Sequence, residues 1–192
     1  EVVRGPASVL YGQASPGGVV ALNSKQPQFQ QAGEARFTLG NNSQRSAAFD
    51  LTGPLGANQR VAYRLLGLAN AADTQFGPVE EERYAIAPSL TWDITDATSL
   101  TLKAYLQEDP EGGYHAGLPY EGTVVDRNGR RISNNFFEGE EEHDRYERTQ
   151  RMLGYALEHS FNEAWTGRQQ LNYLNSDVEL SQVYAYDWAP GS

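Results

Sequence analysis

The 192-residue chain contains no cysteine, one methionine and three histidines. The absence of cysteine excludes a disulfide framework and a metal site built on thiolates. It does not discriminate between a reducing cytoplasm and an outer membrane. The histidines, His115, His143 and His159, are far apart in the sequence, and none has a second ligand at the spacing of a metal site. We therefore expect no metal centre.

Long apolar runs are also missing. No stretch approaches the roughly 18 consecutive apolar residues of a membrane-spanning helix, which excludes a helical membrane protein. A transmembrane β-barrel is not excluded, because its strands need only about 9 to 11 residues, of which every second one is apolar. The hydrophobic content of 39% fits such a barrel and a soluble domain equally well.

Catalytic motifs are absent as well. Ser15 has no nucleophile-elbow pattern around it, and Gly17-Gly18 lacks the Gly-Lys-Ser/Thr of a phosphate loop. The formal net charge of -10 argues against nucleic-acid binding, for which clustered lysine and arginine are expected. We predict no catalytic residue and no nucleic-acid partner.

What the sequence has instead is alternation of apolar and polar residues from Glu34 onward, as in strands with one apolar and one polar face. In the clearest example, Tyr84, Ile86 and Trp92 lie on one side together with Pro88. This proline counts slightly against a central strand, because it lacks a donor for the hydrogen-bond ladder. We predict strand-like segments at 34–39, 47–52, 61–70, 84–94, 100–107, 148–161 and 168–188.

The predicted connections are short near Gly53, Thr95 and Asn162, and longer near Asp73 and Glu111. An outer-membrane barrel shows this alternation, with short periplasmic turns and long extracellular loops. A soluble β-sandwich can show it too. Aromatic residues at strand ends fit either a girdle at a membrane interface or the rim of a sandwich core; they are Tyr84, Trp92, Phe161 and Trp165. These patterns alone leave both architectures open.

The N-terminal run from Arg4 to Pro27 has the order strand, turn, short helix, turn, strand. Pro6 is placed to open a helical turn, and Gly12 supplies a left-handed stop. Ser15 to Gly18 form a tight turn before the apolar residues 19–22. Taken by itself, this pattern also fits a surface connection of an ordinary α+β domain.

The same run resembles the C-terminal end of the plug domain of TonB-dependent outer-membrane receptors, and the siderophore branch in particular. The resemblance rests on Arg-Gly-Pro at 4–6, Val-Leu-Tyr-Gly at 9–12, Ser-Pro-Gly-Gly-Val-Val at 15–20 and Ser-Lys-Gln-Pro at 24–27.

The resemblance implies a mainly β fold in three parts. Residues 1–27 would be the tail of an α+β plug domain and 28–33 a linker. Residues 34–192 would form the first strands, about seven, of an antiparallel transmembrane β-barrel that the family completes with about 22 strands. The chain would then be a piece of a longer protein, with the signal peptide and the TonB-contacting segment before Glu1.

The function implied is import of a ferric siderophore across the outer membrane of a Gram-negative bacterium. The implied partners are the siderophore, the TonB–ExbB–ExbD energising complex, and outer-membrane lipid and lipopolysaccharide, with no covalently bound cofactor. Two alternatives stay open, a TonB-dependent receptor for cobalamin, haem or an oligosaccharide, and a soluble β-sandwich binding module. The motifs Val-Leu-Tyr-Gly and Ser-Pro-Gly-Gly make cobalamin, haem and oligosaccharide less favoured as cargoes. Receptors for those cargoes more often carry a small-residue turn in place of Tyr-Gly.

Candidate ligand contacts come from two regions. The resemblance implies that Tyr11 faces the ligand cavity from the plug apex; packing beneath the plug is the alternative. The long connection between Asp109 and Arg145 offers aromatic edges with polar handles, which suit an amphipathic organic chelate. We predict ligand contacts at Tyr11, Tyr114, His115, Tyr120 and Trp188.

Acidic residues cluster in the same connection and in the one before it. Such a cluster can be a solvated loop, can bridge to lipopolysaccharide through divalent ions, or can favour a substrate with positive charge. Its members are Glu80, Glu81, Glu82, Glu138, Glu140, Glu141, Glu142 and Asp144.

Polar contacts hold the plug inside the barrel in the resembling family. We predict contacts of this kind for Arg4 and Lys25 on the plug side, and for Glu34 and Asp50 on the barrel side. The alternative is that Arg4 and Lys25 are solvated in a separate domain.

Overall fold

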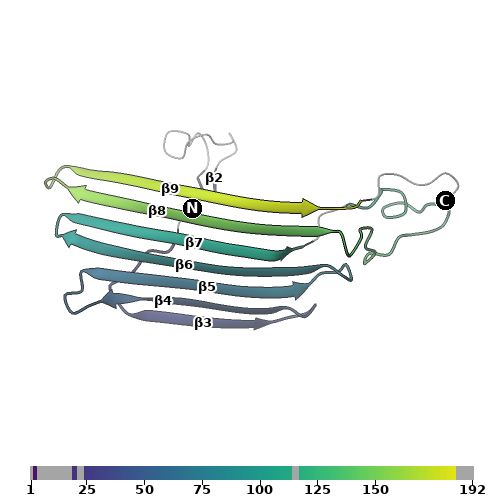
Figure 1. The fold of residues 1–192 in the computed structure, drawn as a ribbon, viewed down its shortest axis with the longest axis horizontal. Helices are drawn as coiled ribbons and strands as arrows, with labels where there is room; N and C mark the ends of the chain where they lie inside the picture. The colour runs from purple at the N-terminus through teal and green to yellow at the C-terminus, as the bar shows by residue number, and fades with distance from the viewer. Residues whose placement is uncertain (1, 4–18, 21–23, 114–116, 185–192) are drawn as a thin grey trace.

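The computed structural model of the chain describes residues 2–3, 19–20, 24–113 and 117–184. Seven antiparallel strands form one sheet in which spatial order follows sequence order (Figure 1). They are β3 (Ala32–Leu39), β4 (Arg45–Leu55), β5 (Val61–Asp73), β6 (Glu80–Thr95), β7 (Thr98–Gly112), β8 (Arg145–Ser160) and β9 (Thr166–Ser181). Separately, β1 (Val2–Val3) pairs with β2 (Val19–Val20). The predicted helical turn after Pro6 lies outside the described residues.

The seven predicted strands are confirmed, and several are longer than predicted. The last one, predicted over 168–188, begins at Thr166 and ends earlier than predicted, at Ser181. The short connection predicted near Gly53 begins later than predicted, because β4 continues to Leu55 and pairs residue by residue with β5 up to Val61. The turn itself uses positive φ angles at Gly56 and Gln59, of 77° and 51°. The longer connection predicted near Asp73 covers only residues 74–79, because β5 ends at Asp73 and β6 begins at Glu80.

The connections differ between the two ends of the sheet (Figure 1). One end has only short turns, at residues 56–60, 96–97 and 161–165, and the other carries 40–44, 74–79 and the long 113–144 connection. The Asn162 side chain closes one short turn by accepting hydrogen bonds from the backbone amides of Ala164 and Trp165, at 2.9 and 3.0 Å. This asymmetry agrees with the up-and-down barrel architecture.

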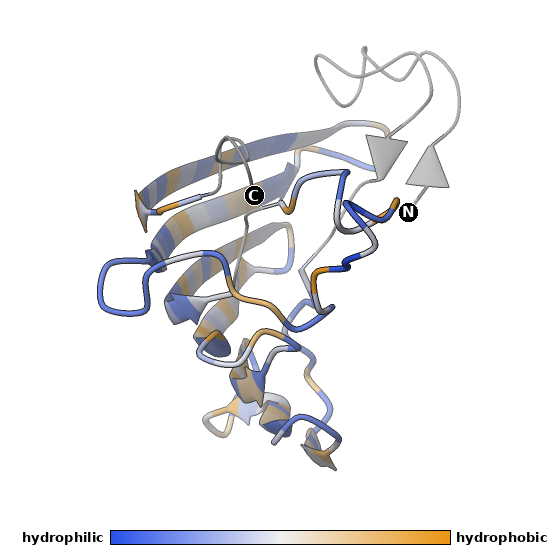
Figure 2. Cartoon of the chain, turned by 90° about the vertical axis from the view of Figure 1, so that its right-hand side faces the viewer, coloured by the Kyte–Doolittle hydropathy of each residue, from blue (hydrophilic) through white to orange (hydrophobic). Residues whose placement is uncertain are grey.

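The sheet has an apolar face and a polar face. Residues that are register partners on neighbouring strands lie on the same face, so the alternation along each strand continues as rows across the sheet. Figure 2 shows the strands in one row, with hydrophobic and hydrophilic residues alternating along them. One continuous register row of the apolar face runs through Leu51, Leu65, Pro88, Ala104, Leu153 and Tyr173. A parallel row of the polar face holds Thr52, Arg64, Ser89, Lys103, Gly154 and Asn172.

No second layer covers either face of the seven-stranded sheet among the described residues. Ala62 is the one apolar residue there that is buried, whereas Phe37 and Leu153 are 80% and 61% exposed. A β-sandwich would bury one face of each sheet at a spacing of about 10 Å, so this geometry excludes the sandwich alternative for the described chain. In the same part of the chain, no helix is long and apolar enough to cross a membrane.

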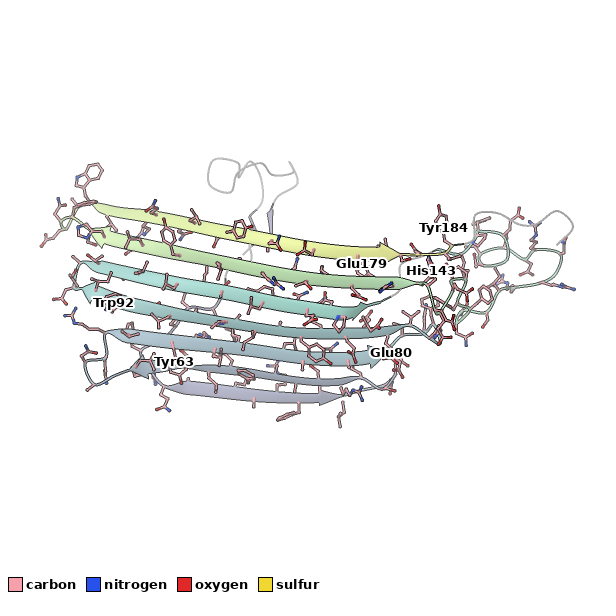
Figure 3. The ribbon with its side chains drawn as sticks, in the orientation of Figure 1. Tyr63, Glu80, Trp92, His143, Glu179 and Tyr184 are labelled. Atoms are coloured by element: carbon pink, nitrogen blue, oxygen red, sulfur yellow. The ribbon has the colours of Figure 1, made fainter. Side chains whose placement is uncertain are left out.

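Aromatic residues bound the apolar stretch of β6. Tyr84 and Trp92 are 46% and 45% exposed on the apolar face, with Ile86, Pro88 and Leu90 between them. Eight residues of strand rise about 26 Å, which at a strand tilt of about 40° spans about 20 Å of the outward apolar band of about 25 Å in outer-membrane barrels. Beyond Tyr84 the register places Glu82 and Glu80 on the same face. Figure 3 shows Glu80 at the end of the sheet that carries the long connection.

A buried carboxylate ties three strands together on the polar face. Asp109 of β7 is 2% exposed, and its oxygens accept bonds from Arg83 Nε of β6 at 2.8 Å and Arg148 Nη2 of β8 at 2.7 Å. Gln107 Nε2 donates to both oxygens, at 2.9 and 2.8 Å, and Tyr105 donates in turn to Gln107 Oε1. Two guanidinium groups around one carboxylate make it the most highly paired acid of the sheet's described residues.

We expect Asp109→Ala to lower the free energy of unfolding of the full-length protein by about 3 kcal/mol, because it leaves two guanidinium groups without their shared partner. The measurement is a urea titration of the purified protein in detergent, read from the gel mobility of unheated samples. Glu34→Gln is the matched control, since it breaks an exposed pair with Arg36 and costs about 1 kcal/mol or less. Equal urea midpoints for the two variants would contradict this role of Asp109.

Candidate functional site

Of the predicted ligand residues, one lies in the part of the chain that the structure describes. Tyr11, Tyr114, His115 and Trp188 lie outside the described residues. Tyr120 is described, and its side chain is 63% exposed. Its carbonyl oxygen accepts the backbone N–H of Val124 at 3.0 Å, which closes a turn at the start of the connection. The tyrosine ring is therefore available to a ligand rather than packed.

The connection has internal order of its own. Asn128 and Gly129 have φ angles of 51° and 73°, and they form a tight two-residue turn between Arg127 and Arg130. These two arginines exchange backbone hydrogen bonds of 3.0 and 2.9 Å. The backbone N–H of Ile132 then donates to the Gly122 carbonyl at 2.7 Å. Asn-Gly suits this turn because both residues tolerate positive φ.

Exposed aromatic and apolar side chains lie at this end of the sheet. Phe136 is 48% exposed and Tyr184, just beyond β9, is 62% exposed. Figure 3 shows Tyr184 and His143 close to the end of β9, and the His143 ring bonds Ser181 Oγ at 3.0 Å through Nε2. Sequence reasoning missed Tyr184. The signal that could have identified it is an aromatic residue directly after the end of a predicted strand.

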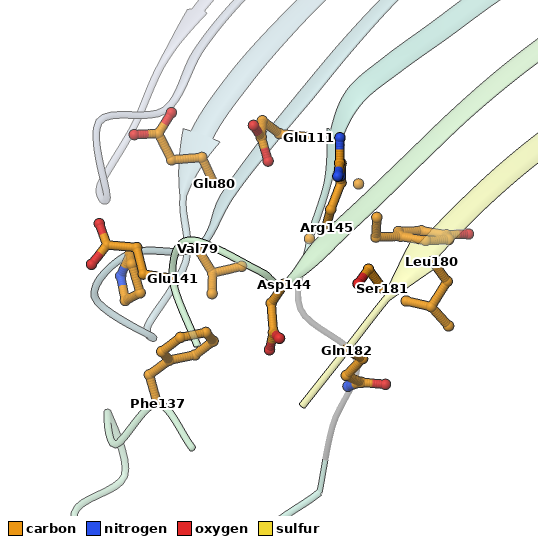
Figure 4. Close-up of a pocket in the computed structure, with 14 residues that line it drawn as sticks. Val79, Glu80, Glu111, Phe137, Glu141, Asp144, Arg145, Leu180, Ser181 and Gln182 are labelled. Carbon is orange, nitrogen blue, oxygen red and sulfur yellow. The ribbon is translucent and has the colours of Figure 1, made fainter. Parts of the chain in front are cut away.

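A small cavity of about 60 Å³ lies where the connection meets the strand ends (Figure 4). This volume holds a few water molecules, not an organic chelate. We conclude that a large ligand would contact the exposed loop side chains rather than enter this cavity. Its charged lining consists of Glu80, Glu111, Glu141, Asp144 and Arg145.

Three members of the acidic cluster, at 80–82, belong to β6 rather than to a connection, and the five in the long connection divide into two groups. Glu140, Glu141 and Glu142 are exposed, as in a solvated loop. Both carboxylate oxygens of Glu138 and Oδ2 of Asp144 are buried and have no hydrogen-bond partner in the described structure. Asp144 Oδ1 does accept the Val183 backbone N–H, at 2.7 Å. Nowhere in the described ranges do three or more histidine, aspartate or glutamate side chains come together to hold a metal ion.

The polar face carries the residues predicted to contact the plug. Lys25 Nζ lies 2.6 Å from Asp50 Oδ2, whereas Glu34, on the same face as Asp50, pairs with Arg36 at 2.7 Å. Arg4 lies outside the described residues. Sequence reasoning missed Arg64, whose Nη2 also lies 2.6 Å from Asp50 Oδ2. Its alternation places it on the polar face, but only the register shows that it meets Asp50.

Comparisons with known proteins agree with this architecture. No family model matches the chain. It is 61% identical over 188 residues to the ferrioxamine B receptor of Salmonella typhimurium (strain SL1344), an alignment that covers 98% of this chain and 27% of that protein. It is 41% identical over 187 residues to the ferrichrome outer membrane transporter/phage receptor of Escherichia coli (strain K12), with 97% and 25% covered. The chain thus spans about a quarter of the length of these curated relatives.

Solved structures show the same fold. The ferripyoverdine receptor of the outer membrane of Pseudomonas aeruginosa matches with a TM-score of 0.83 at 23% identity, over 98% of this chain and 25% of that one. The ferric-catecholate import receptor Fiu of E. coli K12, in its open form, matches with a TM-score of 0.78 at 23% identity, over 92% and 28%. These likenesses confirm the predicted barrel fold. The identities above show that the chain is similar, over about a quarter of their length, to receptors for ferrioxamine and ferrichrome, in agreement with the predicted resemblance to TonB-dependent siderophore receptors.

Proposed function

We propose that the protein of which this chain forms part imports a ferric siderophore across the outer membrane, with ferric ferrioxamine as the first cargo to test. The observation that carries the proposal is the 61% identity to a ferrioxamine B receptor over 98% of the chain. The amphipathic single-layer sheet supports it, because such a sheet suits lipid on one face and a polar lumen on the other.

The transport cycle requires no chemistry on the iron or the chelate. The siderophore binds at the extracellular mouth, and the TonB–ExbB–ExbD complex drives a movement of the plug that opens a path through the lumen. Because polar contacts line the lumen wall, the plug can shift by exchanging hydrogen bonds with water and without exposing a dry apolar core.

The ligand contacts proposed for the mouth are Tyr120 together with Tyr11, Tyr114, His115 and Trp188. Tyr120 is supported by its exposed ring at the end of the sheet that carries the long connection. The excess of carboxylates at this end would favour a cationic siderophore over an anionic one, because a negatively charged surface raises the local concentration of positively charged ligands. The alternative role of these carboxylates is to bind divalent ions that bridge to lipopolysaccharide.

We expect a receptor-deleted strain that carries the full-length gene to grow under iron restriction on ferric ferrioxamine. Tyr120→Ala should raise the half-saturating siderophore concentration about three- to tenfold, because an exposed aromatic contact contributes about 1 kcal/mol. The measurement is uptake of radioactive iron supplied as the purified siderophore, with Tyr84→Ala on the apolar face as the control. Growth only on haem, cobalamin or an oligosaccharide would replace the siderophore proposal by one of those cargoes.

We expect a cation to be tolerated on one face of β9 and not on the other. Leu171→Arg places a charge on the apolar face, at a residue that is 52% exposed, and should lower stability by about 2 to 4 kcal/mol in the bilayer. Gln170→Arg, the adjacent residue on the polar face, should leave the yield of folded receptor unchanged. The measurement is heat-modifiable gel mobility of outer-membrane extracts. Equal yields for both variants would refute the lipid contact of this face.

A further inference from the structure

The segment that leads from the N-terminal region into β3 is fastened to the polar face of the sheet. Lys25, Gln26 and Gln28 each contact a residue of β4 or β5. These contacts span 24 to 38 positions of sequence, so they are tertiary contacts and not features of a local turn. Residues 25–28 therefore lie against the polar face of the sheet, shortly before the chain enters β3.

Asp50 is the centre of the charged part of this attachment. Its Oδ2 lies 2.6 Å from Lys25 Nζ and 2.6 Å from Arg64 Nη2, and its Oδ1 accepts from Arg64 Nε at 2.8 Å. The side chains of Arg64 and Asp50 are only 11% and 12% exposed. A fork-shaped, two-bond pair of this burial is rigid and weakly screened by salt, in contrast to an exposed surface pair.

The backbone of the segment is held as well. Arg64 Nη1 donates to the Gln26 carbonyl at 2.9 Å, and the Gln28 N–H donates to Thr52 Oγ1 at 2.9 Å. Thr52 is 2% exposed, and its own hydroxyl donates a hydrogen bond to the Tyr63 carbonyl oxygen at 2.8 Å. Pro27 stands between the two bonded groups, where its fixed φ angle and missing N–H keep the segment extended.

We propose that Asp50, Arg64 and Thr52 form a clamp that holds residues 25–28 against the lumen wall, and that plug movement in transport ends on the N-terminal side of Lys25. The clamp residues are thus positioning residues for transport. This inference rests on the proposed import function. Its physical basis is that three hydrogen bonds, made by Lys25, Gln26 and Gln28, must break together before the segment can leave the wall. The buried bidentate pair between Arg64 and Asp50 fixes the partners of two of these bonds.

The clamp is tested by amide hydrogen exchange of the full-length receptor in detergent, read by mass spectrometry on peptides within residues 24–31. Asp50→Asn removes the charge that pairs Lys25 and Arg64, and Thr52→Val removes the acceptor of the Gln28 N–H with little change of shape. Each variant should exchange these amides at least tenfold faster than the unaltered receptor. Glu34→Gln, which breaks the neighbouring pair with Arg36, should leave their exchange unchanged.

Two further measurements separate a positioning role from a structural one. The dissociation constant for ferric ferrioxamine B should stay within twofold in both clamp variants, while the rate of its uptake at saturation should fall at least threefold. Unchanged exchange in both variants, equal acceleration in Glu34→Gln, or fast exchange with normal uptake would each overturn the clamp. If the unaltered receptor neither binds nor imports the siderophore, the import proposal fails, whereas the exchange data still report whether the segment is held.

Discussion

The absence of a core on either side of the sheet is the constraint on which the rest of the structure depends. Of the described apolar residues only Ala62 is buried, although the seven strands are fully paired from β3 to β9. Backbone hydrogen bonds hold the strands together, but burial of apolar area has to come from outside the sheet. The two faces therefore need different surroundings, lipid for the apolar face and polar groups or water for the polar face.

On the polar face, charge pairs join neighbouring strands. Asp109 joins β6, β7 and β8, and Asp50 joins β4, β5 and the segment before β3. Each carboxylate lies between two cations, so neither leaves a buried charge uncompensated. Contacts of this kind stiffen the polar face of the sheet at defined points.

Several features were predictable from local sequence patterns and others were not. The alternation through Tyr84, Ile86 and Trp92 identifies β6 because strand periodicity is a local property. Gly53 and Pro54 suggested a turn, yet β4 continues through them, because pairing with β5 outweighs the weak strand propensity of both residues. The charged residues from Glu80 to Arg83 concealed the start of β6, since polar side chains occupy both faces there.

The sequence by itself determined the period of the strands, the order of short and long connections, and the receptor family suggested by residues 4–27. These depend on neighbours along the chain. Only the tertiary structure decided that Arg64 meets Asp50, that Asp109 pairs with both Arg83 and Arg148, and that residues 25–28 lie against the polar face of the sheet. Such contacts depend on register, and a shift of one residue would send each side chain to the opposite face.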